Sequence, residues 1–251
     1  MRILFLLTFL FINLTLSAQL YCPPLSGKVG DPKNIHVSAG FGVNRMFGDI
    51  NDKSSIGTAG YLKVEYTLKK GIAVGIEGQN GKLISKGTRP LDSRFVTNKY
   101  MAGGLAVSVY PVQLFKEKSY TRPRFSTLLI ESLFVEVGAY GVINNYEDVY
   151  RDLNAPSTYG PIYEIDVNGN PIFTERSKTA ILPSVAAGLG IPLHSTHGKN
   201  GNFFSLLPRI QMNFGDNDNL DGYVPRDGNL NYIPGKNDMF VYLSLGVKYS
   251  F

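Results

Sequence analysis

The stretch MFVYLSLGVKYSF (Met239–Phe251) decides the fold of this 251-residue chain. Its residues alternate in character with the period of two that is typical of a β-strand. One face carries only apolar and aromatic side chains, namely Val241, Leu243, Leu245, Val247, Tyr249 and Phe251. The other face carries Tyr242, Ser244, Gly246, Lys248 and Ser250. A strand of a soluble β-sandwich would show the same alternation, so the finish on an aromatic residue is the distinguishing feature.

Seven earlier segments show the same alternation. They lie near Ile35–Asn44, Ala59–Leu68, Ile72–Asn80, Lys99–Tyr110, Leu133–Asn145, Ala180–Ile191 and Phe203–Phe214. Most have the length that a tilted strand needs to cross a bilayer. A soluble exported β domain and a transmembrane β-barrel both fit this pattern, and the eight strands together favour the barrel. We therefore predict an all-β, eight-stranded antiparallel up-and-down barrel over residues 35–251, with the last strand paired to the first because an open edge in lipid leaves backbone groups unpaired.

The connections between these strands differ in length and predict an orientation. Lys69–Gly71 forms a tight turn and 192–202 is also short, whereas 81–98, 146–178 and 215–237 are long. Short connections of such barrels tend to lie in the periplasm, which would place both chain ends there. Asp166–Pro171 (DVNGNP) predicts a hairpin tip inside one long loop. The connection 111–131 is long for a turn and predicts a short helix or a strand extension at the membrane edge.

The N-terminal segment predicts export. Arg2 precedes an apolar run that ends in Ser17-Ala18, so residues 1–18 are expected to be a cleaved signal peptide, with an uncleaved anchor as the alternative. Residues 19–34 then form a periplasmic leader. Its Cys22 is the single cysteine of the chain, either a free thiol or a lipidation site that the bulky Tyr21 disfavours. The net charge of +5, less one for Arg2, is too small and dispersed to indicate a nucleic-acid partner.

The inward faces of the predicted strands carry balanced charge. They place three acidic and three basic residues in the lumen: Lys63, Glu65, Glu77, Glu136, Arg209 and Lys248. The interior of an eight-stranded barrel is just wide enough to be filled by side chains. Buried charges must be paired, so we expect an ion-pair network that plugs the barrel, with a gated pore as the alternative.

Metal and catalytic sites are weakly indicated. Asp216, Asp218 and Asp221 could offer oxygen ligands to Ca²⁺, but the spacing is not that of an EF-hand and an Asn/Asp-rich surface loop is the default interpretation. His194 and His197 are two potential metal ligands without a third nearby. The predicted topology puts His36 and both of these histidines on the periplasmic side. No cofactor is expected, and the chain is not expected to be an enzyme.

The end of the chain also resembles an assembly signal. Ser244, Gly246, Tyr249 and Phe251 fit the polar–x–Gly–x–x–aromatic–x–aromatic pattern of the C-terminal β-signal of outer-membrane barrels. With AGFGVNRMFGDI (Ala39–Ile50) and MAGGLAVSVYP (Met101–Pro111), the chain is similar to the eight-stranded outer-membrane barrels of Bacteroidota, to the transmembrane domain of OmpA and, more loosely, to PorG-type barrels. OmpA's peptidoglycan-binding domain is not expected here.

This resemblance implies a location and partners. It implies the outer membrane of a Gram-negative cell, contact with outer-membrane lipid, and recognition by the barrel-assembly machinery during biogenesis. The predicted function is a non-enzymatic accessory or structural subunit of an envelope complex for secretion or outer-membrane protein assembly, with other envelope proteins as partners. A small porin-like channel and a surface adhesin or recognition protein that uses its long loops are the alternatives.

Overall fold

The computed structural model describes residues 34–48, 55–87, 95–115, 125–150, 164–165, 167, 171–172, 177–193, 204–215, 220 and 238–250. The predicted signal peptide and all of the predicted leader except Asn34 lie outside these residues, so those two assignments stay predictions. Lys33–Phe251 form one compact unit. Eight long strands of this unit are β1 (Ile35–Phe47), β2 (Gly57–Lys69), β3 (Ile72–Lys86), β4 (Phe95–Val109), β5 (Leu133–Tyr150), β8 (Ser177–Leu189), β10 (Phe204–Phe214) and β11 (Met239–Ser250).

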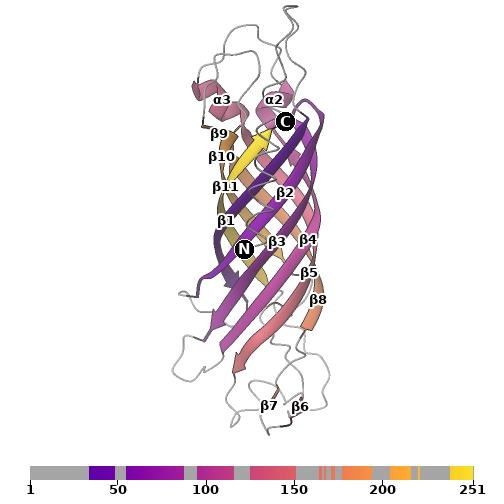
Figure 1. Ribbon diagram of the computed structural model, residues 1–251, viewed down its shortest axis with the longest axis vertical. Coiled ribbons are helices and arrows are strands. Elements are labelled where there is room, and N and C mark those ends of the chain that lie inside the picture. The colour runs from indigo at the N-terminus through magenta and orange to yellow at the C-terminus, as the bar shows by residue number, and fades with distance from the viewer. Residues whose placement is uncertain are drawn as a thin grey trace, which may run out of the picture. The chain divides into compact units, whose positions relative to one another are not determined.

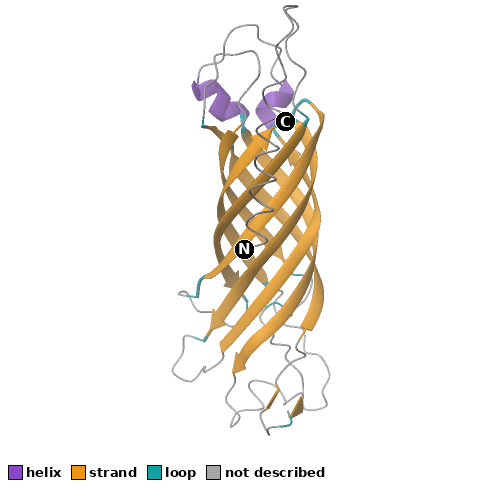
Figure 2. Cartoon of the chain, viewed as in Figure 1, coloured by secondary structure: helices purple, strands orange, loops and turns teal. Residues whose placement is uncertain are grey.

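The strands close into a barrel. Each pairs antiparallel with its neighbours in chain order, and β11 pairs with both β10 and β1. The closing seam between β1 and β11 runs from His36↔Ser250 to Phe47↔Met239. Figure 1 shows the tilted strands, and Figure 2 shows that they surround a single interior. The prediction of a closed eight-stranded antiparallel barrel is therefore confirmed.

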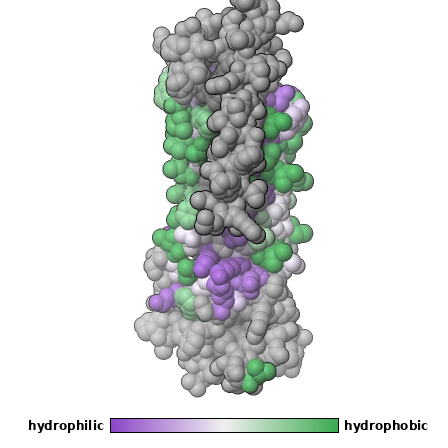
Figure 3. All heavy atoms as spheres, in the orientation of Figure 1, coloured by the Kyte–Doolittle hydropathy of each residue, from purple (hydrophilic) through white to green (hydrophobic). Residues whose placement is uncertain are grey.

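Side chains alternate between the interior and the outside along most of each long strand, with a break in β4 where the register shifts between Thr97 and Asn98. In β5, for example, Val135, Val137 and Ala139 are exposed, while Glu136 and Tyr140 are buried. Large apolar side chains are exposed on the outer face of every long strand, and Figure 3 shows some of them on one side of the barrel. From Leu133 to Ile143 this apolar face spans ten steps of about 3.3 Å, or about 23 Å along the barrel axis for strands tilted by about 45°. That height fits the apolar band of about 25 Å on outer-membrane barrels.

Several strands extend beyond their predicted ends. The prediction that 81–98 is a loop was wrong at both ends, because β3 and β4 stay paired as far as Lys86↔Phe95. The prediction of a loop over 146–178 was also too long, since β5 reaches Tyr150 and β8 begins at Ser177. The hydrogen bonds between neighbouring strand backbones do not require apolar side chains on the outer face. The strands therefore stay paired at polar residues that had suggested loops.

One barrel end carries the short connections, and we call it the turn end. Gly71 occupies the predicted tight turn with a positive φ of 80°, which favours glycine, and its carbonyl accepts a hydrogen bond from the Tyr110 amide at 2.8 Å. The predicted short helix in 111–131 is present as α2 (Pro111–Phe115) and α3 (Phe125–Glu131). Among the described helices, none has the length and apolar character to cross a membrane.

The opposite end, which we call the loop end, carries the long connections. The hairpin predicted around Asp166–Pro171 is present, since β6 (Glu164–Ile165) pairs antiparallel with β7 (Pro171–Ile172).

At the turn end, β8 stops at Leu189 and a short β9 (Ile191–Pro192) continues the pairing with β10 after Gly190. The predicted strand over Ala180–Ile191 is thus divided at this glycine.

Candidate functional site

The six predicted lumen charges all lie inside the barrel. Lys63 and Glu65 come from β2, Glu77 from β3, Glu136 from β5, Arg209 from β10 and Lys248 from β11. In each case the residues directly before and after it in the same strand face outward, so the alternation of the strand points the charged side chain inward. Five of the six side chains are buried, and that of Lys248 is partly buried, with 12% of its surface exposed. The structure therefore brings together residues up to 183 positions apart in the sequence.

Arg209 crosses the lumen and joins three strands. Its Nη1 donates to Glu77 Oε1 at 2.8 Å, and its Nη2 donates to Glu136 Oε1 at 2.7 Å. Its guanidinium also lies 5.4 Å from the centre of the Tyr61 ring. The planar fork of arginine suits two carboxylates at once, so a single side chain ties β10 to β3 and β5.

Lys63 continues the network towards the turn end. Its ammonium is paired with the other oxygen of Glu136 and lies 2.9 Å from Glu65 Oε1. Ser108 Oγ sits between the same two carboxylates, 2.7 Å from Glu65 and 2.9 Å from Glu136. The ammonium of Lys63 and the hydroxyl of Ser108 therefore each contact both carboxylates and offset the repulsion between them.

Lys248 ends the network near the turn-end opening. Its Nζ donates to Glu65 Oε2 at 3.2 Å and to the Tyr110 hydroxyl at 2.8 Å. Tyr110 lies just past the end of β4, and burial raises the pKa of its phenol. Three acids and three bases thus form one connected and charge-balanced chain of contacts.

Amides extend this polar interior towards the loop end. Gln79 Nε2 donates to Glu77 at 2.7 Å and to Gln211 Oε1 at 2.8 Å. Gln211 in turn donates to Asn213 Oδ1 at 2.7 Å. Tyr140 donates its hydroxyl to the second oxygen of Glu77 at 3.3 Å. These contacts occupy the lumen with side chains rather than leaving its charges open to solvent.

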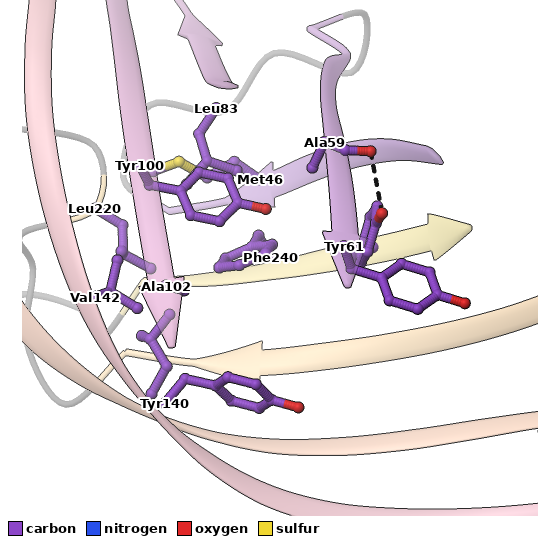
Figure 4. Close-up of a cluster of buried hydrophobic side chains, with 12 residues drawn as sticks. Met46, Ala59, Tyr61, Leu83, Tyr100, Ala102, Tyr140, Val142, Leu220 and Phe240 are labelled. Atoms are coloured by element: carbon purple, nitrogen blue, oxygen red, sulfur yellow. Dashed lines mark hydrogen bonds between the residues drawn. The ribbon is translucent and has the colours of Figure 1, made fainter. Parts of the chain in front are cut away.

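A cluster of buried apolar and aromatic side chains lies in the loop half of the lumen beside buried amides, and it was not predicted from the sequence. We call this cluster the apolar plug. Its members are Met46, Ala59, Tyr61, Leu83, Tyr100, Ala102, Tyr140, Val142, Leu182, Leu220, Phe240 and Tyr242. Figure 4 shows labelled members such as Tyr100 and Phe240 converging from several strands. The Tyr100 and Phe240 rings lie 5.5 Å apart. Met46 and Leu83 were missed because the predicted strands ended before them. Had the inward alternation been continued past Asn44 and Asn80, it would have found both.

Leu220 belongs to the plug although it lies between two barrel strands in the sequence. Its side chain is fully buried. Its amide donates to Asp238 Oδ2 and its carbonyl accepts from Asn98 Nδ2, both at 2.9 Å. These two backbone contacts hold the residue in the barrel mouth, and no sequence pattern indicated this.

The predicted β-signal residues have structural partners in the wall. Ser244 is buried, and Tyr249 packs its ring 4.8 Å from that of Phe204 at the turn end. Gly246 leaves room for Tyr61, because a Cβ there would lie 2.2 Å from the Tyr61 hydroxyl and 2.8 Å from the Ala39 carbonyl oxygen. Phe251 lies outside the described residues. Recognition of this segment by an assembly machinery stays a prediction.

The weaker candidate sites are placed as follows. His36 lies at the turn end, where its ring nitrogens are 2.8 Å from Ser250 Oγ and 3.0 Å from Thr67 Oγ1. His194 and His197 lie outside the described residues, and so do the weak calcium candidates Asp216, Asp218 and Asp221. Within the part of the chain that is described, no group of three or more His, Cys, Asp or Glu side chains could hold a metal ion.

Comparisons with known proteins found similar solved structures at low sequence identity. No family model and no curated protein matches the chain. Similar solved structures include Neisserial surface protein A, with 13% identity over 86% of this chain and 97% of that one and a TM-score of 0.44. Ail, the attachment invasion locus protein of Yersinia pestis, was solved with the heparin analogue sucrose octasulfate and is 11% identical over 88% of this chain and 100% of that one, with a TM-score of 0.46.

A third similar structure is the N-terminal β-barrel domain of Pseudomonas aeruginosa OprF. It has 11% identity over 87% of this chain and 98% of that one, and a TM-score of 0.38. These neighbours are eight-stranded outer-membrane barrels. The narrower resemblance to Bacteroidota and PorG-type barrels stays a prediction.

Proposed function

We propose that this chain is a non-conducting outer-membrane β-barrel that acts as a structural or accessory subunit of an envelope complex for secretion or barrel assembly. The observation that carries the proposal is the filled lumen. Arg209 and its partners occupy the turn half, and Tyr100, Phe240 and Leu220 occupy the loop half. A barrel blocked along its length works through its outer wall and its two ends.

The wall supports the membrane setting of this proposal. Large apolar side chains such as Leu105 and Ile76 are 68% and 66% exposed, and similar residues face outward on every long strand. A soluble protein rarely exposes a contiguous apolar surface of this extent. A closed barrel in lipid leaves no strand edge unpaired. All backbone N–H and C=O groups of its strands can therefore form hydrogen bonds within the protein, as the hydrocarbon core of a bilayer requires.

The experiment is a purification of the tagged chain from native outer membranes in mild detergent, followed by mass spectrometry. Stoichiometric envelope proteins are expected, and their identity would name the process. A chain that elutes only as a lone monomer at several detergent concentrations would contradict the subunit role. The periplasmic orientation of both ends can be tested in the same cells by tagging the chain after Ser250 and probing access to the tag.

Recognition at the cell surface is a second candidate. The observation that favours it is the β6–β7 hairpin, whose turn residue Val167 is fully exposed. An apolar side chain at the tip of a paired hairpin suits contact with a partner. Deletion of 164–172 should then abolish ligand binding and leave the barrel heat-modifiable on gels. Unchanged binding after the deletion would contradict this role for the hairpin.

A further inference from the structure

Charged residues gather on the outer wall at the loop end. Among the described residues, the exposed ones there are Arg45, Lys82, Lys86, Lys99 and Glu147, of which four are basic and one is acidic. They come from β1, β3, β4 and β5, whereas the described outward-facing residues of β8, β10 and β11 carry no charge. Figure 3 shows hydrophilic residues gathered on the wall towards this end. The charge therefore marks one side of the barrel.

Two lysines of this group lie directly opposite each other. Lys82 on β3 pairs with Lys99 on β4, and both side chains point outward, 50% and 45% exposed. Like charges at directly opposite positions disfavour strand pairing. Glu147 on β5 offsets only one of them, with Oε1 paired to Lys99 and Oε2 4.0 Å from Lys82. Among the described residues, this arrangement leaves an excess of one positive charge on the pair of lysines.

The lysines lie where the apolar wall ends. On β4 the next outward residue towards the membrane centre is Met101, followed at Leu105 by the exposed apolar band. Phosphate headgroups lie just outside the hydrocarbon core of a bilayer. Anionic headgroups attract basic side chains near the membrane surface. The two ammonium groups are therefore at the depth where a lipid phosphate would meet them.

Beneath the lysines the wall has a shallow row of glycines. Gly78, Gly103 and Gly141 pair directly across β3, β4 and β5 and all face outward. A Cβ at Gly103 would meet no atom within 4 Å, and at the other two it would meet only one carbonyl oxygen, at 3.9 or 4.0 Å. Packing within the chain therefore does not demand glycine here, and glycine in a strand can mark close approach of a ligand. The exposed side chains of Leu105 and Met101 stand on either side of the row.

We propose that the outer face of β3, β4 and β5 binds one anionic lipid, with its phosphate between Lys82 and Lys99 and an acyl chain along the wall over the glycine row. Four strand positions separate Lys99 from Gly103, about 13 Å along the strand, which an acyl chain spans. Phosphate suits the site better than a protein carboxylate. Glu147 already supplies a carboxylate, and it leaves one positive charge of the two lysines unneutralised. The inference requires the membrane setting of the barrel but not its role as a subunit.

The test is native mass spectrometry of the purified, delipidated chain titrated with phosphatidylglycerol, lipid A or the net-neutral phosphatidylcholine. The K82Q/K99Q variant should bind both anionic lipids about tenfold or more weakly than the unaltered chain. The matched control K69Q/K70Q removes the same charge from exposed lysines at the turn end and should change binding less than twofold. Anionic lipids should bind more tightly than phosphatidylcholine.

A second variant tests the acyl-chain contact separately. Gly103→Leu places a side chain in the glycine row at a position where a Cβ meets no atom within 4 Å, and it should weaken binding of long-chain phosphatidylglycerol several-fold, with little effect on a short-chain analogue. Equal binding by K82Q/K99Q and the unaltered chain would overturn the proposal. So would complete competition by inorganic phosphate, which would indicate a free-anion site, or loss of a co-purifying protein instead of lipid from K82Q/K99Q.

Discussion

Replacing Arg209 with methionine removes the cation that links two carboxylates across the lumen. Methionine keeps much of the side-chain volume and adapts to irregular gaps, so the change is chiefly electrostatic. Glu136 keeps Lys63 and Ser108 as partners. Glu77 keeps Gln79 and Tyr140 as hydrogen-bond donors, but no other cation among the described residues pairs with it, and it is fully buried. Most of the loss in the free energy of unfolding should therefore come from the buried charge of Glu77, which is left without a cation.

The expected loss is about 3–5 kcal/mol in the free energy of unfolding, the range for a buried ion pair broken on one side. Urea unfolding of the protein in lipid vesicles, followed by the gel shift between folded and unfolded barrel, measures it. Neutralising the orphaned acid in the Arg209→Met/Glu77→Gln double variant should restore about 2 kcal/mol or more. The Glu136→Gln partner change should restore less, because Glu136 still has Lys63.

The matched control is Glu147→Gln, which breaks an exposed ion pair on the outer wall. It should cost about 0–1 kcal/mol. The reasoning would be refuted if Arg209→Met lay within about 1 kcal/mol of the unaltered chain. It would also be refuted if the Glu77 and Glu136 double variants were equally stable, since their partners differ.

The remaining predictions concern the plug and the glycines. Leu220→Ala should destabilise the barrel by about 2–4 kcal/mol and raise cleavage of the loop end by added protease; a change below about 0.5 kcal/mol would mean that Leu220 does not fill the mouth. Gly246→Ala should cost about 1–3 kcal/mol in urea unfolding because the new methyl group meets Tyr61 and the backbone. Gly103→Ala, where there is open space, should be neutral or stabilise by up to about 1 kcal/mol; a larger loss there than at Gly246 would contradict the packing described.

The alternation of side chains made most of the wall predictable. Whether Glu77 or Arg209 faces inward depends only on its own strand neighbours, which the sequence shows directly. Which partner each finds depends on strand register and on distances across the lumen, and these two residues are 132 positions apart. Strand ends were harder to predict, because outward residues such as Asn80 and Lys82 have the polarity of a loop while their backbone stays paired. Leu220 has no periodic pattern around it, and only tertiary contacts reveal that it is buried.

Single-channel recording in planar bilayers tests the blocked lumen most directly. With the ion-pair network and the apolar plug both in place, the reconstituted protein should show no stable open level over a wide voltage range. In the Arg209→Met and Leu220→Ala variants, current should flow only during the events in which the ion-pair network or the apolar plug opens. A stable open level in the unaltered protein, with a conductance that changes on Glu77→Gln, would contradict the account and make the chain a pore.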